Sequence, residues 1–200
     1  MKIAIEAMDG LGKRTVSKRL ATDFDKMLIE KPLSELFELA DVNGSKELNG
    51  VSSKIYDFED EAIKAWFFGL GNLYTFIKYE DKDLVIDRHF ASNYFWNGTN
   101  RTDCIFNTMI EIIGVPDLTV VLTASVNSRL ERLYNRNPND YDITDVEKMV
   151  KGDDKMIDFL NRFNIPFVEV NTDNKNADEV YEEVKSLVNE LKNGMRRVLK

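Results

Sequence analysis

Five short apolar runs alternate with segments of helical period, and this alternation restricts the possible folds more than any other feature. The runs cover residues 2–7, 27–30, 83–87, 118–124 and 166–170. Each is short and mainly apolar, as strands buried on both faces of a parallel sheet tend to be. Because parallel strands need crossover helices, the order predicts an α/β fold in three layers, with a five-stranded parallel sheet and helices on both faces.

The longest helix is expected over residues 60–79, where large apolar residues recur every three or four positions. The residues of this stripe, most of which we expect to be core, are Ile63, Trp66, Phe67, Leu70, Tyr74 and Ile77. Residues 177–191 repeat the same period and predict a closing amphipathic helix.

The composition sets limits on organisation and partners. A chain of 200 residues with 43% hydrophobic residues is expected to form one domain, residues 1–200. The formal net charge of -8 argues against nucleic acid and anionic membranes as partners. The single cysteine, Cys104, cannot form an internal disulfide, and no apolar run reaches the roughly 20 residues of a membrane span. We therefore expect a cytoplasmic protein.

The first apolar run leads into a candidate phosphate-binding loop, "IEAMDGLGKRTVSKRL", residues 5–20. In such a loop a strand turns tightly into a helix, so that backbone N–H groups and the helix N-terminus face one anion. Gly10 and Gly12 suit the turn, and Lys13 stands where its ammonium would bind the β- and γ-phosphates. The alternative is an ordinary glycine-containing turn with an exposed lysine.

Two residues depart from the pattern G-x-x-x-x-G-K-[ST]. Ala7 replaces the first glycine, and Arg14 replaces the hydroxyl residue that normally binds Mg²⁺. Thr15 cannot take over, because one step along a helix turns a side chain by roughly 100°. We expect the Arg14 guanidinium to add charge that Mg²⁺ otherwise supplies and so to weaken the requirement for this ion; the alternative is an arginine turned to solvent.

A second cluster follows the third apolar run, in "VIDRHFASNYFWNG", residues 85–98. Asp87 and Arg88 come at the carboxyl end of a strand, where open α/β sheets bind ligands. Asp87 is expected to orient Mg²⁺ through water, and Arg88 to bind a phosphate with its planar guanidinium. The alternative is a salt bridge at a strand end.

Together these segments resemble the thymidylate kinase family of P-loop nucleoside monophosphate kinases. The loop resembles [FI]-E-G-x-D-G-x-G-K-[ST]-T, the second segment D-R-[YH]-x-x-S-x-x-A-Y-Q-G, and "VPDLTVVL", residues 115–122, the family's P-D-L-T strand. The resemblance implies the P-loop NTPase fold, ATP and Mg²⁺ as cofactors, and a homodimer. It also implies that Asp9 holds the 3'-hydroxyl of the acceptor and Arg88 its phosphate.

The resemblance further implies a lid, at about residues 134–146, whose arginines close over the donor phosphates. The candidates are Arg129, Arg132 and Arg136, and Leu11 makes them important because some relatives carry an arginine at its position. Each is otherwise a residue of a solvated helix face.

The acceptor base is expected at a further group of residues. Phe68 would stack on it, with Trp96 and Asn97 in place of the family's tyrosine and glutamine, and Ser92 matches the second motif. Asn72 stands where relatives carry an arginine, which leaves the choice of base open. Phe68 is alternatively a core residue.

The sequence therefore predicts a kinase that phosphorylates dTMP to dTDP with ATP. Alternatives are a kinase for another nucleotide or deoxynucleoside, with Asp9 or Glu6 as the base, and a non-catalytic nucleotide-binding homologue. The expected catalytic residues are Lys13, Asp9, Arg88, Arg132 and Arg136. The expected cofactor-binding residues are Asp9, Gly10, Leu11, Gly12, Lys13, Arg14, Thr15 and Arg129, with Asp87 at the metal. The expected substrate-binding residues are Asp9, Phe68, Asn72, Arg88, Ser92, Trp96 and Asn97.

Overall fold

The computed structural model describes residues 1–37, 44–139, 141–144 and 146–194. Its helices and strands, in chain order, are β1 (Lys2–Ala7), α1 (Lys13–Asp23), β2 (Met27–Ile29), α2 (Pro32–Phe37), α3 (Gly44–Tyr56), α4 (Glu61–Lys78), β3 (Leu84–Asp87), α5 (Phe90–Asn97), α6 (Asp103–Ile113), β4 (Leu118–Thr123), α7 (Val126–Arg136), the short 3₁₀ helix η2 (Tyr141–Thr144), α8 (Val146–Arg162), β5 (Phe167–Asn171) and α9 (Ala177–Lys192).

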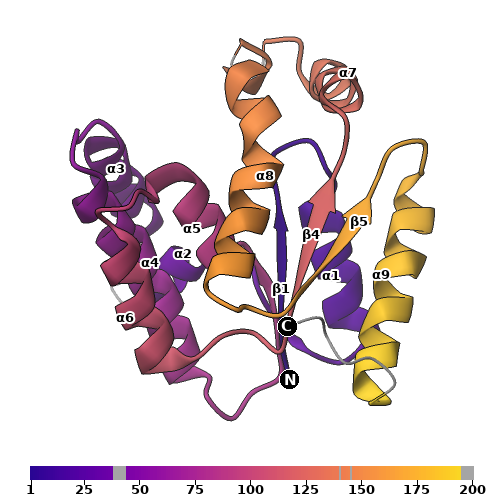
Figure 1. The fold of residues 1–200 in the computed structure, drawn as a ribbon, viewed down its shortest axis with the longest axis horizontal. Coiled ribbons are helices and arrows are strands. Elements are labelled where there is room, and N and C mark those ends of the chain that lie inside the picture. Colours follow the sequence, from indigo (N-terminus) through magenta and orange to yellow (C-terminus); the bar gives the residue numbers. More distant parts are fainter. Residues whose placement is uncertain (38–43, 140, 145, 195–200) are drawn as a thin grey trace.

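The five strands form one parallel sheet in the order β2-β3-β1-β4-β5. Helices α1 and α9 cover one face, and α4, α5 and α8 lie on the other, with α6 packed outside α4 (Figure 1). The predicted three-layer α/β fold is confirmed. Each of the five strands falls on its predicted run, and no strand end differs from the prediction by more than one residue. The three central strands, β3, β1 and β4, are almost entirely buried between the helical layers.

The long helix α4 lies where the sequence predicts it, but the expectation that its apolar stripe is core is wrong. Ile63, Trp66, Leu70 and Ile77 are all exposed, whereas the buried face carries small residues and Phe76. A Cβ at Gly69 would lie 2.2 Å from Met109 of α6. Glycine therefore lets α4 pack closely on its neighbours, and large side chains do not fit between them.

Gly71 has the same role toward α2, because a Cβ there would lie 2.3 Å from the backbone of Leu33. The ends of α4 match the prediction more closely. The Asp60 side chain caps the first turn by accepting hydrogen bonds from the N–H groups of Ala62, at 2.8 Å, and Ile63, at 3.4 Å.

The closing helix α9 is confirmed, and the capping box formed by Asn176 and Glu179 fixes its start. Helix α3 is not among the predicted elements. The lid segment at about residues 134–146 includes the end of α7 and η2, while residues 140 and 145 lie outside the described residues. Within the described ranges, no helix has the length and apolar character to cross a membrane, and no three acidic, histidine or cysteine side chains are grouped as metal ligands.

Candidate active site

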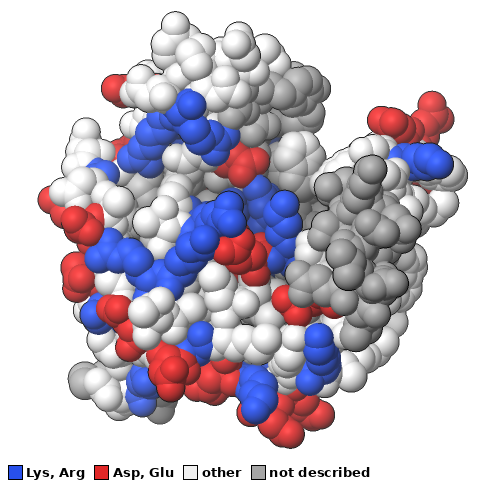
Figure 2. All heavy atoms as spheres, turned by 180° about the vertical axis from the view of Figure 1, so that it is seen from behind, with Lys and Arg blue, Asp and Glu red and all other residues white. Residues whose placement is uncertain are grey.

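A cleft of about 1020 Å³ opens at the carboxyl edge of the sheet, where β1 lies between β3 and β4. The segments that follow β1 and β3 at this edge turn to opposite faces of the sheet. Open α/β sheets bind ligands at such a point. All of the predicted site residues line the cleft except Arg129. Figure 2 shows basic side chains gathered around a hollow, with acidic side chains beside them.

The loop after β1 has the geometry of an anion cradle. Gly10 and Gly12 have φ angles of 87° and 78°, in the region that favours glycine, and Gly12 is the N-cap of α1. Ala7 is the last residue of β1 and pairs with Leu122, so its backbone is extended. The missing first glycine therefore places no strain on the loop.

Two helices of the opposite half of the chain touch this loop. A Cβ at Gly10 would lie 3.2 Å from the Leu133 side chain of α7. A Cβ at Gly152 of α8 would lie 2.6 Å from the sulfur of Met8. The loop is thus held from one side by α7 and from another by α8.

Asp9 connects the two phosphate-binding cations expected from the sequence. The Arg88 guanidinium donates a hydrogen bond to Asp9 Oδ1 at 2.5 Å, and Lys13 Nζ lies 3.6 Å from the same oxygen. Lys13 is only 8% exposed, and burial, together with the charge of Arg88, lowers the pKa of its ammonium. One carboxylate therefore lies between a cation at the start of α1 and a cation that directly follows β3.

Asp87, at the end of β3, is buried and lines the cleft, and its Oδ1 has no hydrogen-bond partner among the described residues. Burial raises the pKa of its carboxyl group, and the charge of Lys13 opposes this effect. A buried carboxylate oxygen without a donor beside a phosphate loop is a suitable acceptor for the water shell of Mg²⁺. The residues present therefore fit the ion that the sequence implies.

Arg14 lines the cleft, but its guanidinium pairs with Glu30 at the end of β2, at 2.6 Å. Lys18 Nζ lies 3.0 Å from the other oxygen of Glu30. Thr15 also lines the cleft. The position expected to carry a metal-binding hydroxyl therefore carries a salt bridge instead.

The fully buried carboxylate of Glu6 organises the segment after β3. It accepts hydrogen bonds from the N–H groups of His89 and Ala91, at 2.8 and 3.0 Å, and from the Ser92 hydroxyl. These bonds hold the start of α5 next to β1, and Arg88 takes a φ of 75° just before it. Ser92 lines the cleft, but its hydroxyl proton is directed to Glu6.

The three candidate lid arginines on α7 have different surroundings. Arg129 is 1% exposed and does not line the cleft; its Nη1 lies 3.6 Å from Asp153 of α8. Burial raises the pKa of Asp153 to about 6, against the effect of Arg129. Arg132 lines the cleft and donates to the hydroxyl and carbonyl oxygens of Thr172, at 2.8 and 2.6 Å. Arg136, at the end of α7, also lines the cleft.

Aromatic residues form the wall of the cleft away from the loop. The ring centroid of Phe68 lies 4.9 Å from that of Tyr56, which comes from α3. Both rings line the cleft, as does Trp96 on α5. Phe68 therefore faces the cleft, as expected for a residue that stacks on a base.

Three asparagines line the same wall, and two of them have fixed orientations. The carbonyl of Ala65 can only accept, so Asn93 donates to it with Nδ2, at 3.0 Å. Asn93 Oδ1 then accepts from Asn97 Nδ2, at 2.9 Å. Asn97 is left with an oxygen to offer a ligand, while Asn72, 2% exposed, makes no side-chain hydrogen bond to a described residue.

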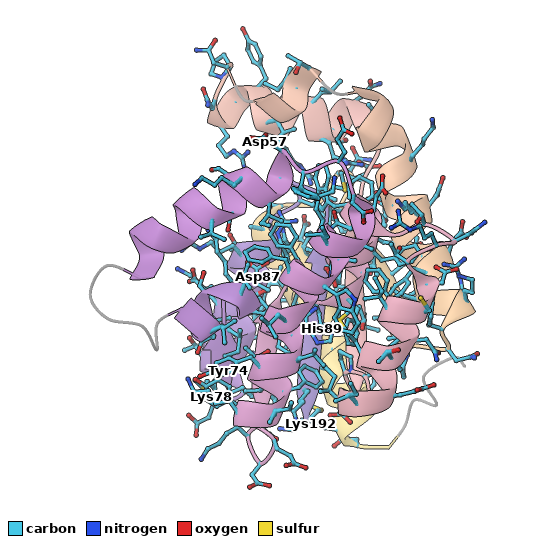
Figure 3. The ribbon with its side chains drawn as sticks, turned by 90° about the vertical axis from the view of Figure 1, so that its left-hand side faces the viewer. Asp57, Tyr74, Lys78, Asp87, His89 and Lys192 are labelled. Carbon is cyan, nitrogen blue, oxygen red and sulfur yellow. The ribbon has the colours of Figure 1, made fainter. Side chains whose placement is uncertain are left out.

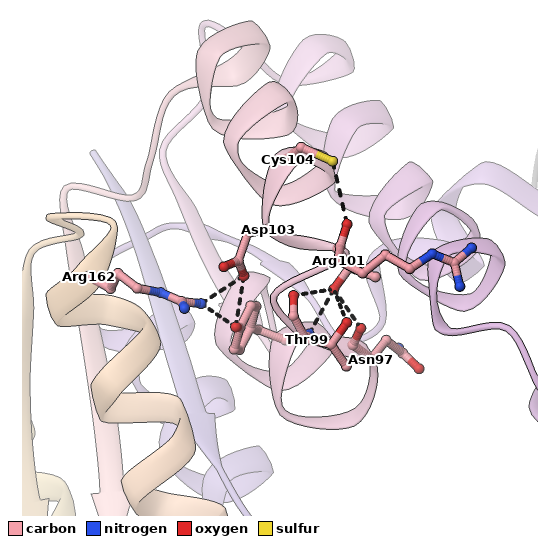
Figure 4. A network of polar contacts seen from close by, with 8 residues as sticks. Asn97, Thr99, Arg101, Asp103, Cys104 and Arg162 are labelled. Carbon is pink, nitrogen blue, oxygen red and sulfur yellow. Dashed lines mark hydrogen bonds and ion pairs between the residues drawn. The ribbon is translucent and has the colours of Figure 1, made fainter.

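The turn after α5 supports this arrangement. The Thr102 hydroxyl donates a hydrogen bond to the carbonyl oxygen of Asn97, at 3.0 Å, and accepts one from the N–H of Thr99, at 2.8 Å (Figure 4). Beside it, Arg162 of α8 contacts Asp103 at 2.8 Å. The end of α5 is therefore tied to α6, and α6 is tied in turn to α8.

Comparison with known sequences shows which family the chain belongs to. Residues 5–184 match the family model described as thymidylate kinase. The chain belongs to the thymidylate kinase family. It is 27% identical over 141 residues to a probable thymidylate kinase of Metallosphaera sedula, an alignment that covers 67% of this chain and just under two thirds, 66%, of that protein. A probable thymidylate kinase of Methanocaldococcus jannaschii is 24% identical over 92% of this chain and 93% of its own length.

Solved structures show the same fold. The thymidylate kinase of Candida albicans superposes with a TM-score of 0.67 at 18% identity, over 96% of this chain and 92% of that chain. A deoxyadenosine kinase from M. mycoides with bound dCTP gives a TM-score of 0.62 at 18% identity, over 95% and 100%. The chain thus has the architecture of P-loop kinases and belongs to a family of nucleoside monophosphate kinases.

Several cleft residues are not among those expected from the family motifs. Glu30, Ser52 and Tyr56 line the cleft from β2 and α3, and Asn93 lines it from α5. Asn93 lies one residue after Ser92 inside the matched segment, so its position in the motif was a usable signal. Ser52 and Tyr56 had none, because helix α3 itself was not predicted.

His89 packs between aromatic rings. Its ring centroid lies 4.5 Å from that of Phe76 and 4.1 Å from that of Phe90. In Figure 3, His89 and Asp87 both lie within the body of the protein. The Nε2 atom has no hydrogen-bond partner in the part of the chain that the structure describes, and burial lowers the pKa of the ring to about 3.

His89→Phe is expected to remove a loss of stability in acid. A histidine in the unfolded chain has a pKa of about 6.5. Below that pH the unfolded chain binds a proton at His89 that the folded chain does not bind. The wild type should lose about 2 kcal/mol more than the variant between pH 7 and pH 5. Urea unfolding of both proteins at the two pH values measures this difference. The opposite contribution of Asp153 is present in both and cancels, and equal changes in the two proteins would contradict the expectation.

Proposed function

We propose that the protein transfers the γ-phosphoryl group of ATP to a deoxynucleoside monophosphate, with dTMP as the acceptor and dTDP and ADP as products. The observation that carries this proposal is the position of Asp9. Its carboxylate contacts Lys13 of the donor loop at 3.6 Å and Arg88 at 2.5 Å. Two phosphate-binding cations held by one residue would place two phosphate groups next to each other, as an in-line transfer requires.

On the donor side, the backbone N–H groups of the loop and Lys13 would hold the β- and γ-phosphates. Asp87 would hold Mg²⁺ through water, and the ion would supply charge neutralisation at those phosphates. Arg136, in the lid at about residues 134–146, and Arg132, just before the lid and after release from Thr172, would offset charge on the transferred group. Arg129 has no such role in this proposal, because it is buried against Asp153.

On the acceptor side, Arg88 would bind the phosphate with its planar guanidinium, and Asp9 the 3'-hydroxyl. Phe68 would stack on the base. The fixed oxygen of Asn97 suits a base edge that donates a hydrogen bond, such as N3–H of thymine, and the Asn72 amide can donate to a neighbouring carbonyl. Because Asn72 is an amide and not an arginine, another deoxynucleoside monophosphate is the second candidate acceptor.

A nucleoside acceptor is less well supported, since its hydroxyl group needs a base. Glu6 is buried with three donors directed at it, and Asp9 lies between two cations. Neither carboxylate is placed to take a proton from a substrate. A phosphate acceptor needs no such base.

An assay of ADP release tests the proposal directly. The purified protein is incubated with ATP and Mg²⁺ and with dTMP, dUMP, dCMP, dGMP, dAMP or thymidine in turn. We expect turnover that depends on dTMP. Turnover with another monophosphate would reassign the pocket around Asn72 and Asn97, turnover with thymidine alone would overturn the monophosphate acceptor, and ATP binding without turnover would identify a non-catalytic relative.

We further propose a cytoplasmic homodimer that forms through the exposed face of α4. This face is formed by Ile63, Trp66, Leu70 and Ile77, and the neighbouring helix α6 carries a further exposed apolar residue, Ile112. Apolar side chains gathered on adjacent helices are typical of protein interfaces. A second copy of the chain would cover them by two-fold symmetry.

Trp66→Glu is expected to convert the dimer to a monomer. The two-fold interface would then bury two carboxylates, one from each chain, and each would lose its hydration. Sedimentation equilibrium should give twice the 23.1 kDa of one chain for the wild type and that mass itself for the variant. Lys82→Glu, in an exposed turn, serves as the control and should remain dimeric. A monomeric wild type would exclude the proposed interface.

A further inference from the structure

The residue that replaces the loop hydroxyl is held by a partner outside the loop. Arg14 Nη2 donates to Glu30 Oε2 at 2.6 Å, and Lys18 Nζ lies 3.0 Å from Oε1. The Arg14 side chain is 67% exposed, although its backbone lies in the first turn of α1 next to the buried Lys13. The guanidinium thus extends away from the loop toward the edge of the sheet.

Glu30 and Asp87 are neighbours across two strands. Ile29 pairs with Ile86 in the β2–β3 register, so Glu30 and Asp87 follow at the next position of each strand. Adjacent strands lie about 4.8 Å apart. Arg14 therefore has two carboxylates within the same part of the cleft. It pairs with Glu30, while Oδ1 of the buried Asp87 accepts no hydrogen bond from any residue that the structure describes.

We propose that Glu30 is a positioning residue of the donor site, which holds the Arg14 guanidinium away from Asp87 and from the donor phosphates. The proposal rests on the proposed use of ATP and Mg²⁺. It reverses the hypothesis drawn from the sequence alone, in which Arg14 replaces part of the charge of the ion. With Arg14 held on Glu30, that charge is left to the divalent cation.

The physical reason is competition for one carboxylate. Among the described residues, no group of three acidic or histidine ligands forms a metal cage, so Asp87 is the carboxylate available to the ion at the end of β3. A released guanidinium would pair with Asp87 or bind the phosphates bidentately. Either contact would lower the benefit that Mg²⁺ brings to nucleotide binding.

Glu30→Gln tests the proposal, because it removes the charge and keeps the shape of the side chain. Calorimetric titration gives the Kd of ATP in the presence of Mg²⁺ and in the presence of EDTA. The ratio of the EDTA value to the Mg²⁺ value measures how much the ion contributes. We expect this ratio to fall about fivefold in the variant, the effect of losing one partly exposed ion pair.

Two further variants make the result specific. In an Arg14→Ser background, Glu30→Gln should leave the ratio unchanged, since the residue it holds is gone. Asp178→Asn is the matched control: it removes the partner of Arg19, also on α1 and also at 2.6 Å, and should leave the wild-type ratio unchanged. Thermal unfolding checks that each variant is folded.

The proposal is overturned if Glu30→Gln leaves the ratio at the wild-type value, or if it changes the ratio equally with and without Arg14. A wild-type protein that binds no ATP in either buffer would overturn the donor assignment itself, and this inference with it. If the protein binds ATP more tightly with Mg²⁺, but Glu30→Gln does not change the ratio of the two Kd values, the inference is contradicted and the donor assignment stands.

Discussion

Replacing Lys13 with alanine is expected to lower turnover by about a thousandfold, the scale at which single charged groups act in phosphoryl transfer. Lys13 is the buried cation of the donor loop, 3.6 Å from Asp9. Burial already lowers the pKa of its ammonium, so the fold should tolerate its removal. Steady-state kinetics with ATP and dTMP measure the loss, and thermal unfolding shows whether the variant remains folded.

A matched control for this variant is Lys82→Ala, which removes an exposed lysine from the turn before β3. It should retain wild-type turnover. If Lys13→Ala kept more than a tenth of the wild-type rate, the loop would not be the donor site, whatever its resemblance to one.

Replacing Glu6 with alanine is expected to lower the free energy of unfolding by about 3 to 5 kcal/mol. The substitution leaves the N–H groups of His89 and Ala91 and the Ser92 hydroxyl buried without an acceptor. The carboxylate itself is costly to bury, and burial raises its pKa, which keeps the loss below the sum of three strong hydrogen bonds. Urea unfolding at pH 7 measures the change.

Ser92→Ala is the control for Glu6, because it removes one of the three donors and leaves the carboxylate. It should cost about 1 kcal/mol. A Glu6→Ala variant that loses no more than this would show that Glu6 does not organise the start of α5. The KM for the acceptor should also rise in Glu6→Ala, since Arg88 directly precedes the segment that Glu6 holds.

The parts of the fold that follow from local pattern were predictable from the sequence. The strands and the loop from β1 into α1 depend on short apolar runs and on Gly10 and Gly12, and each lies where the pattern places it. The cleft is predictable for the same reason, because the carboxyl ends of β1 and β3 meet at one edge of the sheet.

Which face of α4 is buried was not predictable from hydrophobicity, because the size of the side chains decides which face packs against the other helices. Gly69 and Gly71 permit close contact with α6 and α2, and the large residues are turned outward. A periodic stripe shows that a helix has an apolar face, and the face can equally meet another molecule.

The remaining site residues depend on contacts between distant parts of the chain. Glu30 reaches Arg14 only because β2 pairs with β3, and Arg129 is directed to Asp153 only because α8 packs beside α7. The role of Asn97 depends on the carbonyl of Ala65, two contacts away. No motif carries this information, since it is a property of the packed structure.

The contacts of the loop with α7 and α8 have a consequence for how this family can diverge. Met8 fills the space in front of Gly152, and Leu133 fills the space in front of Gly10. A larger residue at position 152 therefore fits only with a smaller one at position 8, and a change at position 133 alters the room above the loop. Among homologues, these pairs are expected to covary across more than 120 positions of sequence, so the evolutionary record should couple the loop after β1 to helices α7 and α8.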